Sequence, residues 1–168
     1  MEPAATSNKI KFYSTRGDYG CFSNFSNHRV SYKGHTYKTS EHAFQSMKFE
    51  GTKHEKEVRE SSGPSEAARM GRDRKLPLRK DWESVKISIM YDIVYAKFTQ
   101  NEDLKKTLLD TGDSVLIEST SNDSFWADGG DGSGKNMLGI ILMQVREKIK
   151  SINSQTFKLT SECGIIQS

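Results

Sequence analysis

Two long segments with a helical repeat of apolar side chains limit the folds open to this chain of 168 residues. Between residues 82 and 98, and again between residues 137 and 150, apolar side chains recur at the spacing that places them on one face of an α-helix. They are Trp82, Val85, Ile89, Ile93 and Ala96 in the first segment and Leu138, Ile141, Leu142, Val145 and Ile149 in the second. Both segments are therefore predicted to be helices with one buried face.

The remaining pattern favours an α+β, helix-rich single domain with a small β-sheet. Short strand patterns occur at KIKFYS, RVSY, HTYK and SVLIE, and Lys33-Gly34 can turn the second strand into the third. Further helices are predicted after a cap at Thr39 or Ser40, over residues 53–61 and 64–71, and between Asn101 and Gly112. Because the strands do not alternate with helices, a βαβ fold is excluded. We expect the domain to span residues 9–150, with flexible tails at 1–8 and 151–168.

Size and cysteine content place the chain in an ordinary globular class. A chain of 168 residues can bury a core without disulfides. Cys21 and Cys163 lie near opposite ends without ligand spacing, which predicts reduced thiols. The N-terminal stretch MEPAATSNK has no apolar signal segment, and no stretch is long and apolar enough to span a membrane. We therefore expect a soluble monomer that is cytoplasmic or nuclear and not secreted.

The stretch DGGDGSGKN, residues 128–136, contains the G-x-x-x-x-G-K pattern of a P-loop. A P-loop needs Ser or Thr after the lysine and a strand that leads directly into it, but here Asn136 follows Lys135. Asp128 and Asp131 would also place negative charge where phosphate binds. A calcium loop fails as well, because a glycine stands where that motif needs Glu. The stretch is therefore predicted to be a glycine-rich loop, which either only turns the chain or offers N–H groups to an anion.

The helix predicted over residues 41–49 carries the main candidates for a polar site. Glu41, Gln45 and Lys48 are spaced i, i+4, i+7 and share one face. Such a stripe is common on exposed helices, where it contributes little. Here His42 adjoins Glu41, aromatic residues precede the helix and basic residues follow it. A nucleotide pocket is the functional alternative to an exposed charged stripe.

The flanking segments supply side chains that suit a nucleotide. The aromatic residues before the helix are Phe12, Tyr13, Tyr19, Phe22 and Phe25. Phenylalanines are more often core residues, whereas tyrosines and Trp126, each with a polar group, suit a pocket wall. The basic residues after the helix are Arg69, Arg72, Arg74, Lys75, Arg79 and Lys80. Such a cluster suits phosphate groups, although a solvated basic turn gives the same pattern.

Four blocks of the sequence carry a more specific pattern. They are FYSTRGDYGCFSNF, TSEHAFQSMKF, AARMGRDRKLPLRKDWESVK and NDSFWADGGDGSGKNMLG. In this order they resemble the NADAR family, also known as YbiA-like proteins, from about Ile10 to Lys150. The resemblance implies a YbiA-like fold and an N-glycosidase that cleaves the bond between a ribose anomeric carbon and nitrogen. The family's substrates are ADP-ribose on the amino group of guanine, or N-ribosylated pyrimidine intermediates of riboflavin synthesis.

The resemblance also implies roles for particular residues. The family's essential glutamate falls on Glu41, its lysine on Lys48, its R-M-G-R-D-R block on residues 69–74 and its W-x-D-G-G block on residues 126–130. The predicted catalytic residues are Glu41, Lys48 and Asp128. The predicted substrate-binding residues are Tyr13, Ser14, Tyr19, Phe22, Asn24, Phe25, His42, Gln45, Arg69, Gly71, Arg72, Arg74, Trp82, Trp126, Gly129, Gly130, Lys135 and Asn136.

These residue types suit cleavage of a ribose C–N bond. The reaction builds positive charge at the anomeric carbon, and the carboxylate of Glu41 can stabilise that charge or deprotonate the attacking water. Lys48 can donate a proton to the leaving nitrogen, or as a neutral amine it can form a Schiff base with an opened ribose. Asp128 is a second carboxylate for water or ribose hydroxyls. No metal-ligand cluster and no cofactor motif is present, so neither a metal nor a cofactor is expected.

The substrate expected first is ADP-ribosylated guanine in nucleic acid or nucleotides, with ADP-ribose as the product. The six cations from Arg69 to Lys80 exceed what one monophosphate needs. Ribosylamino-pyrimidine phosphates are the alternative substrates within the same reaction class. A non-catalytic module that binds ADP-ribose or nucleic acid is the alternative from another class. It is disfavoured by Glu41 beside Lys48, because an anionic ligand gives no reason for a carboxylate in its pocket.

Overall fold

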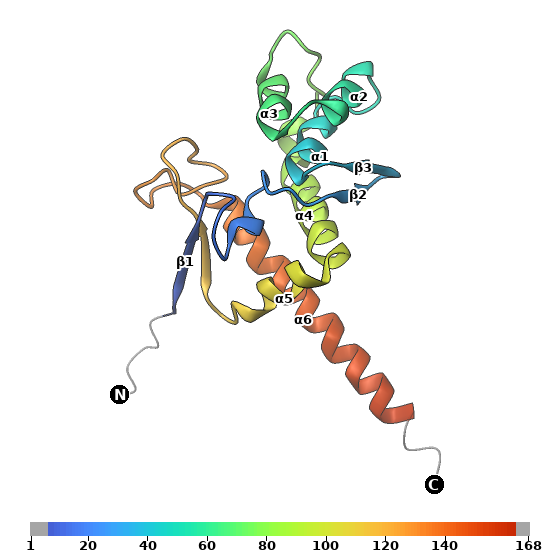
Figure 1. The fold of residues 1–168 in the computed structure, drawn as a ribbon, viewed down its shortest axis with the longest axis vertical. Coiled ribbons are helices and arrows are strands. Elements are labelled where there is room, and N and C mark those ends of the chain that lie inside the picture. Colours follow the sequence, from blue (N-terminus) through green and yellow to red (C-terminus); the bar gives the residue numbers. More distant parts are fainter. Residues whose placement is uncertain (1–6, 164–168) are drawn as a thin grey trace.

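The computed structural model describes residues 7–163, and its class is α+β and helix-rich, as predicted (Figure 1). Its helices are α1 (Ser40–Met47), α2 (Lys53–Glu60), α3 (Pro64–Arg72), α4 (Trp82–Gln100), α5 (Glu102–Asp110) and α6 (Met137–Cys163). Its strands are β1 (Lys9–Phe12), β2 (Val30–Tyr32), β3 (His35–Tyr37) and β4 (Val115–Glu118), and a short 3-10 helix, η1, spans Gly20–Phe22.

The small sheet is divided into two separate pairs of strands. β2 and β3 are antiparallel, and the turn between them has φ of 47° at Lys33 and 79° at Gly34. Positive φ at both positions is the geometry of a type I′ hairpin turn, which confirms the predicted turn. β1 and β4 lie far apart in the sequence but pair in parallel, with Phe12 opposite Glu118. The carboxyl ends of these two strands therefore meet at one edge.

The two amphipathic segments form the helices that dominate the core. α4 and α6 pack against each other, and α6 also covers β4. The predicted inward positions that are buried are Trp82, Ile89, Ile93, Leu138, Ile141, Leu142, Val145 and Ile149. Val85 and Ala96 are half-buried at the edge of the same cluster. No helix within residues 7–163 has the length and apolar character needed to cross a membrane.

Every residue of α1 is buried, although the helix contains charged and polar side chains. α1 packs against α2, α3 and α4. Its start is fixed by Thr39, whose side-chain oxygen accepts a hydrogen bond from the backbone N–H of His42 at 3.3 Å. The burial excludes the interpretation of Glu41 and Lys48 as an exposed charged stripe.

A side chain of the glycine-rich loop completes the edge of β4. Asn136, with φ of 50°, accepts a hydrogen bond at Oδ1 from the N–H of Glu118 and donates one from Nδ2 to the carbonyl of Leu116, both at 2.9 Å. The amide thus pairs with β4 as a neighbouring strand would and satisfies two backbone groups of that strand. This contact joins the end of β4 to the start of α6.

The carboxylate of Asp128 organises the same loop. It accepts hydrogen bonds from the N–H of Gly130 at 2.8 Å, from the N–H of Thr120 at 3.2 Å and from the hydroxyl of Ser119 at 3.1 Å. In a P-loop, backbone N–H groups of this kind face a phosphate. Here an acidic side chain of the loop itself occupies them, which agrees with the rejection of a nucleoside triphosphate site.

The flexible tail predicted for residues 151–168 is wrong over its first part, because α6 continues to Cys163. Figure 1 shows this end of α6 projecting from the rest of the fold. Residues 151–160 are exposed, so local hydrogen bonds hold the helix, including those from Ser154 to Lys150 and from Thr156 to Ile152. The missing amphipathic period indicated the lack of a packed face, not the lack of a helix. Residues 164–168 and 1–6 of the predicted tails lie outside the described residues.

We predict that Gly139→Ala destabilises the protein, because a Cβ there would lie 2.1 Å from the carbonyl oxygen of Leu116. In an ordinary helix interior this change stabilises by about 1 kcal/mol. Here we expect a loss of roughly 2–3 kcal/mol in the free energy of unfolding, measured in urea. Ser151→Ala, on the exposed end of α6, is the matched control and should change stability by less than about 0.5 kcal/mol. A Gly139→Ala protein as stable as wild type would contradict the close packing of α6 on β4.

Candidate active site

A cavity of about 670 Å³ lies between α1, α3 and the loops that follow β1, η1 and β4. This volume suits a small-molecule ligand, since such pockets measure roughly 300–1,000 Å³. The predicted site residues that line it are Tyr13, Ser14, Asn24, Phe25, Glu41, Gln45, Lys48, Arg72 and Trp126. The structure thus brings together side chains from four sequence blocks, and α1 forms one wall.

Glu41 projects into the cavity from the first turn of α1, where its backbone N–H donates to the carbonyl of Asn24 at 3.0 Å. One carboxylate oxygen accepts a hydrogen bond from Nε2 of Gln45 at 2.7 Å. Burial raises the pKa of Glu41, and the Gln45 hydrogen bond and the positive charge of Lys48 oppose that rise. The carboxylate is thus held in place, largely removed from water and close to a positive charge.

Lys48, immediately after α1, places its amine on the same side. Its Nζ donates to the carbonyl of Gly71 at 3.2 Å and lies 5.6 Å from the ring centre of Trp82 and 5.9 Å from that of Phe44. Burial is the main cause that lowers the pKa of Lys48 from 10.5 to about 8, and the charge of Arg74 adds to it. A lysine with this pKa exchanges readily between its charged and neutral forms near neutral pH.

The aromatic candidates divide between the cavity and the core. Tyr13 and Phe25 line the cavity with large exposed surfaces, and Trp126 lines it while packing on Phe44 at 5.3 Å between ring centres. Phe22 does not, because it is buried in the core against Phe12 and Phe98. Phe22 is therefore a core residue, as the alternative interpretation held, and its predicted contact with substrate is wrong. Tyr19 stacks on Phe22 at 5.4 Å and Trp82 packs behind Phe44, so both lie outside the cavity lining.

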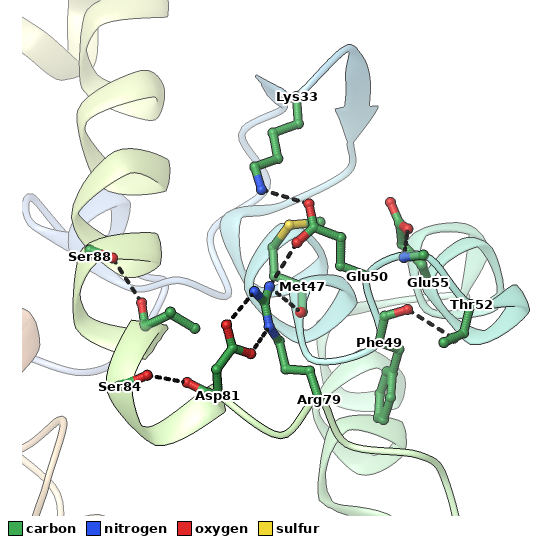
Figure 2. A network of polar contacts seen from close by, with 12 residues as sticks. Lys33, Met47, Phe49, Glu50, Thr52, Glu55, Arg79, Asp81, Ser84 and Ser88 are labelled. Atoms are coloured by element: carbon green, nitrogen blue, oxygen red, sulfur yellow. Dashed lines mark hydrogen bonds and ion pairs between the residues drawn. The ribbon is translucent and has the colours of Figure 1, made fainter.

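Most of the basic segment does not reach the cavity. Arg72 lines it, but Arg69 pairs with Glu66 at the protein surface. Figure 2 shows Arg79 held by Asp81 and Glu50, which also binds Lys33. The six cations therefore do not form one phosphate-binding patch. The sequence shows where the basic residues cluster, but it does not show which acidic residues the fold places beside them.

Arg74, Gly71 and His42 have structural positions. The carbonyl of Gly71 accepts hydrogen bonds from both Arg74, at 2.8 Å, and Lys48. A Cβ at Gly71 would lie 1.8 Å from Oε1 of Gln45, so glycine allows α3 to approach α1. His42 is fully buried and contacts Thr39 and Ser61 through its two ring nitrogens. These residues shape the site from behind and do not line it.

The glycine-rich loop also supports the cavity without lining it. Asp128 and Asn136 make the loop contacts described above, and hydrogen bonds, first that from the N–H of Gly130, lower the pKa of Asp128. Gly129 and Gly130 have positive φ, and Lys135 lies over the ring of Phe125 at 5.5 Å. The cavity lining does not include these loop residues, so the predicted contacts of the loop with substrate and the predicted catalytic role of Asp128 find no support there. Its backbone contacts explain its composition instead.

Sequence reasoning missed an acidic wall opposite α1. Residues of β4 and the following loop that line the cavity are Glu118, Thr120, Asn122 and Asp123; the other unpredicted lining residues are Thr15, Ser23, Phe44, Ala68 and Met90. Burial, followed by the charges of Asp123 and Glu41, raises the pKa of Glu118 to about 7. A glutamate at the end of an apolar strand is a signal that could have found Glu118, because ligands often bind at the carboxyl ends of parallel strands. Its use requires knowledge that β4 pairs with β1.

Within residues 7–163 no group of three or more His, Cys, Asp or Glu side chains is arranged to hold a metal ion. The groups that line the cavity include carboxyl groups on two walls, one amine, one guanidinium and several aromatic rings.

The fold and cavity define a helix-rich α+β protein with a polar pocket of small-molecule size. The sequence profile of the NADAR domain matches residues 11–150. The chain is 51% identical over 140 residues to N-glycosidase YbiA of Escherichia coli K12, which covers 83% of this chain and 88% of that protein. The solution structure of E. coli YbiA matches with a TM-score of 0.82 and 48% identity, over 89% of each chain. The chain belongs to the NADAR family.

Other relatives carry two kinds of name. N-glycosidase Npun_R5314 of Nostoc punctiforme is 41% identical over 150 residues, which cover 88% of this chain and 96% of that protein. The riboflavin biosynthesis protein PYRR of Zea mays is 40% identical over 157 residues, but the match covers 84% of this chain and only 25% of that longer protein.

We predict that Lys48 titrates near its shifted value of about 8 in the free protein. Heteronuclear NMR of ¹³C-labelled lysine side chains measures this, with Lys48→Arg to assign the signal. In Glu41→Gln the pKa should fall further, because the carboxylate favours the ammonium form. An ordinary lysine pKa, or one that is the same in both proteins, would contradict the buried placement of the amine beside Glu41.

Proposed function

We propose that this NADAR-family N-glycosidase hydrolyses the ribose C1–N bond of ADP-ribosylated guanine and releases ADP-ribose. The observation that carries the proposal is a cavity of about 670 Å³ in which Glu41 and Lys48 face the same space beneath aromatic walls. The bond class is supported by relatives named N-glycosidases. The volume leaves room for a ligand larger than one nucleotide.

Glu41 supplies the negative charge that the reaction needs. As the C1–N bond breaks, positive charge spreads over the anomeric carbon and the ring oxygen. A carboxylate that is already fixed by Gln45 and shielded from water stabilises this charge more than a mobile one does. The same carboxylate can accept a proton from the attacking water.

Lys48 has two possible roles, and its position suits both. As an ammonium group it can stabilise the departing nitrogen base; as a neutral amine it can attack the aldehyde of an opened ribose and form an imine. The lowered pKa of Lys48, about 8, gives access to both forms. Borohydride added during turnover separates the roles, because only the imine leaves a covalent adduct on Lys48.

The rest of the ligand has suitable partners along the cavity. Arg72 is the cation of the basic segment that reaches it, and it offers a planar donor pair for a phosphate. Tyr13 and Phe25 expose 51% and 38% of their surface, so a base can stack on them without displacing core side chains. Phosphate and base would thus be held apart from the catalytic carboxylate.

A ribosylamino-pyrimidine phosphate is the second candidate substrate. It is favoured by the name of the maize riboflavin biosynthesis relative. It is also favoured by the cavity, because Arg72 alone from the basic segment lines it and one guanidinium suits one phosphate. In both candidates the leaving group is an exocyclic amine on an aromatic heterocycle, a purine in one and a pyrimidine in the other, so the same chemistry serves both.

We predict that ADP-ribosyl-guanosine is hydrolysed with a higher kcat/KM than the riboflavin-pathway ribosylamine, and that ADP-ribose inhibits more strongly than ribose 5-phosphate. Mass analysis of the products and steady-state kinetics provide the measurement. Arg72→Gln should weaken inhibition by ADP-ribose in a salt-dependent way, whereas Arg69→Gln, which removes a surface pair, should not. The opposite order of both substrates and inhibitors would assign the enzyme to the pyrimidine intermediate. Failure to cleave either substrate would contradict the proposed function.

We predict that Glu41→Gln lowers kcat by at least about a hundredfold, the usual effect of losing a positioned acid or base. Glutamine preserves the size of the side chain, so the melting temperature should change little. Glu57→Gln, an exposed change on α2, is the control and should retain full activity. A Glu41→Gln enzyme with a rate near wild type would remove this carboxylate from the mechanism.

A further inference from the structure

We propose that Glu118 is the general acid of this site, which protonates the leaving nitrogen while Glu41 accepts a proton from water. The inference deepens the proposed N-glycosidase function and rests on it. It assigns a catalytic role to the wall formed by β4.

The fold places Glu118 at the edge where ligands reach a parallel strand pair. Glu118 is the last residue of β4 and lies opposite Phe12, the last residue of β1. The chain beyond each strand enters the cavity lining, with Tyr13 on one side and Thr120 on the other. The two extensions are also joined, because Asn122 donates a hydrogen bond to the Tyr13 hydroxyl at 3.3 Å. Glu118 therefore faces the cavity from a fixed edge, opposite the α1 wall that carries Glu41.

The backbone of Glu118 is held on both sides, but its carboxyl group is not. Its N–H donates to Oδ1 of Asn136 and its carbonyl accepts from the N–H of Asp128, both at 2.9 Å. Among residues 7–163 the carboxyl group of Glu118 makes no hydrogen bond or ion pair. A half-buried carboxyl without a protein partner is costly for folding alone. It is available to a ligand in the cavity.

The charges near Glu41 and those near Glu118 differ in sign. Burial raises the pKa of Glu41, but the hydrogen bond from the Gln45 amide and the positive charges of Lys48 and Arg72 favour its ionised form. The charges that act most on Glu118 are all negative, from Asp123, Glu41 and Asp128, and with burial they raise its pKa to about 7. Glu41 thus has partners that stabilise its charge, whereas the charges around Glu118 favour its protonated form. Two carboxyl groups separated in this way provide one base and one acid.

The chemistry requires such an acid. When the C1–N bond breaks, its electron pair stays on a nitrogen attached to a purine or pyrimidine, and the resulting anion is a poor leaving group. In the proposed step the proton of the Glu118 carboxyl moves to that nitrogen, which departs as a neutral amine. Water forms the new C1–O bond and gives a proton to Glu41, and proton exchange with solvent restores both groups. The products are ribose with a C1 hydroxyl and the free amine, so atoms and charge balance.

The first test compares Glu118→Gln with wild type on the amine-linked substrate that wild type cleaves. We expect kcat to fall at least about a hundredfold, with KM within about threefold. In wild type kcat should decline as pH rises through about 7, because the acid is active only while protonated, and this decline should be absent from the residual activity of Glu118→Gln. Glu118→Asp should restore part of the rate. Glu147→Gln, exposed on α6, is the control and should behave as wild type.

An electrostatic variant distinguishes a catalytic from a structural role. Asp123→Asn removes a charge that raises the pKa of Glu118, so the alkaline decline of kcat should move to lower pH. A merely structural role of Glu118 does not predict such a shift. Glu118→Gln with a wild-type rate and an unchanged pH profile, or Asp123→Asn with an unmoved decline, would overturn the proposal.

A second measurement does not depend on activity. NMR of ¹³C-labelled glutamate carboxyl groups should give Glu118 a pKa of about 7 in wild type and a lower one in Glu41→Gln. This remains decisive if Glu118→Gln fails to fold, and a Glu118 that titrates at its ordinary value would overturn the assignment. The two proposals fail in different ways. If wild type cleaves no ribosylamine the proposed function is wrong, whereas an active wild type with an active Glu118→Gln contradicts only the acid.

Discussion

The burial of α1 is the constraint on which the rest of the structure depends. A helix with Glu41, Gln45 and Lys48 inside the fold needs a partner for each polar group, because an unpaired buried polar group costs about 1–3 kcal/mol. Gln45 binds Glu41, and the carbonyl of Gly71 binds Lys48. These contacts require α3 to lie so close to α1 that position 71 has no room for a side chain. Oε1 of Gln45 still lacks a hydrogen-bond partner among the described residues, so the burial of α1 leaves one polar atom unsatisfied.

The opposite wall of the cavity, formed by β1, β4 and the loops that follow them, is held by a different set of contacts. β1 and β4 are separated by about a hundred residues, and such long-range pairs carry a high closure entropy. The side-chain amide of Asn136 offsets this cost by making hydrogen bonds to two backbone groups at the free edge of β4. Asp128 closes the loop between β4 and Asn136 by accepting a hydrogen bond from Gly130. α6 then covers β4 closely because Gly139 has no side chain. The glycine-rich stretch therefore acts on the cavity indirectly, through the position of Glu118 and its neighbours.

Local pattern predicted the elements well, and the packing of distant segments limited the rest. The α4 and α6 helices, the Thr39 cap and the Lys33-Gly34 turn are encoded over a few residues, and the structure confirms them. Nine of the residues that were predicted from the four sequence blocks line one cavity. Which cations remain unpaired could not be predicted, since Glu50 neutralises Arg79 only after folding. The role of Phe22 and the acidic wall likewise depend on contacts between segments far apart in the chain.

The cavity lining contains acidic as well as basic side chains, and this argues against a module that only binds anions. Lys48 and Arg72 lie on the side of α1 and α3, whereas Glu118 and Asp123 lie on the side of β4. A purely anionic ligand would gain from Lys48 and Arg72 but be repelled by Asp123 and Glu41. A substrate with phosphate at one end and a leaving nitrogen that needs a proton at the other suits both. On our proposal its phosphate faces Arg72, its nitrogen faces Glu118, and the ribose carbon between them lies within reach of Glu41.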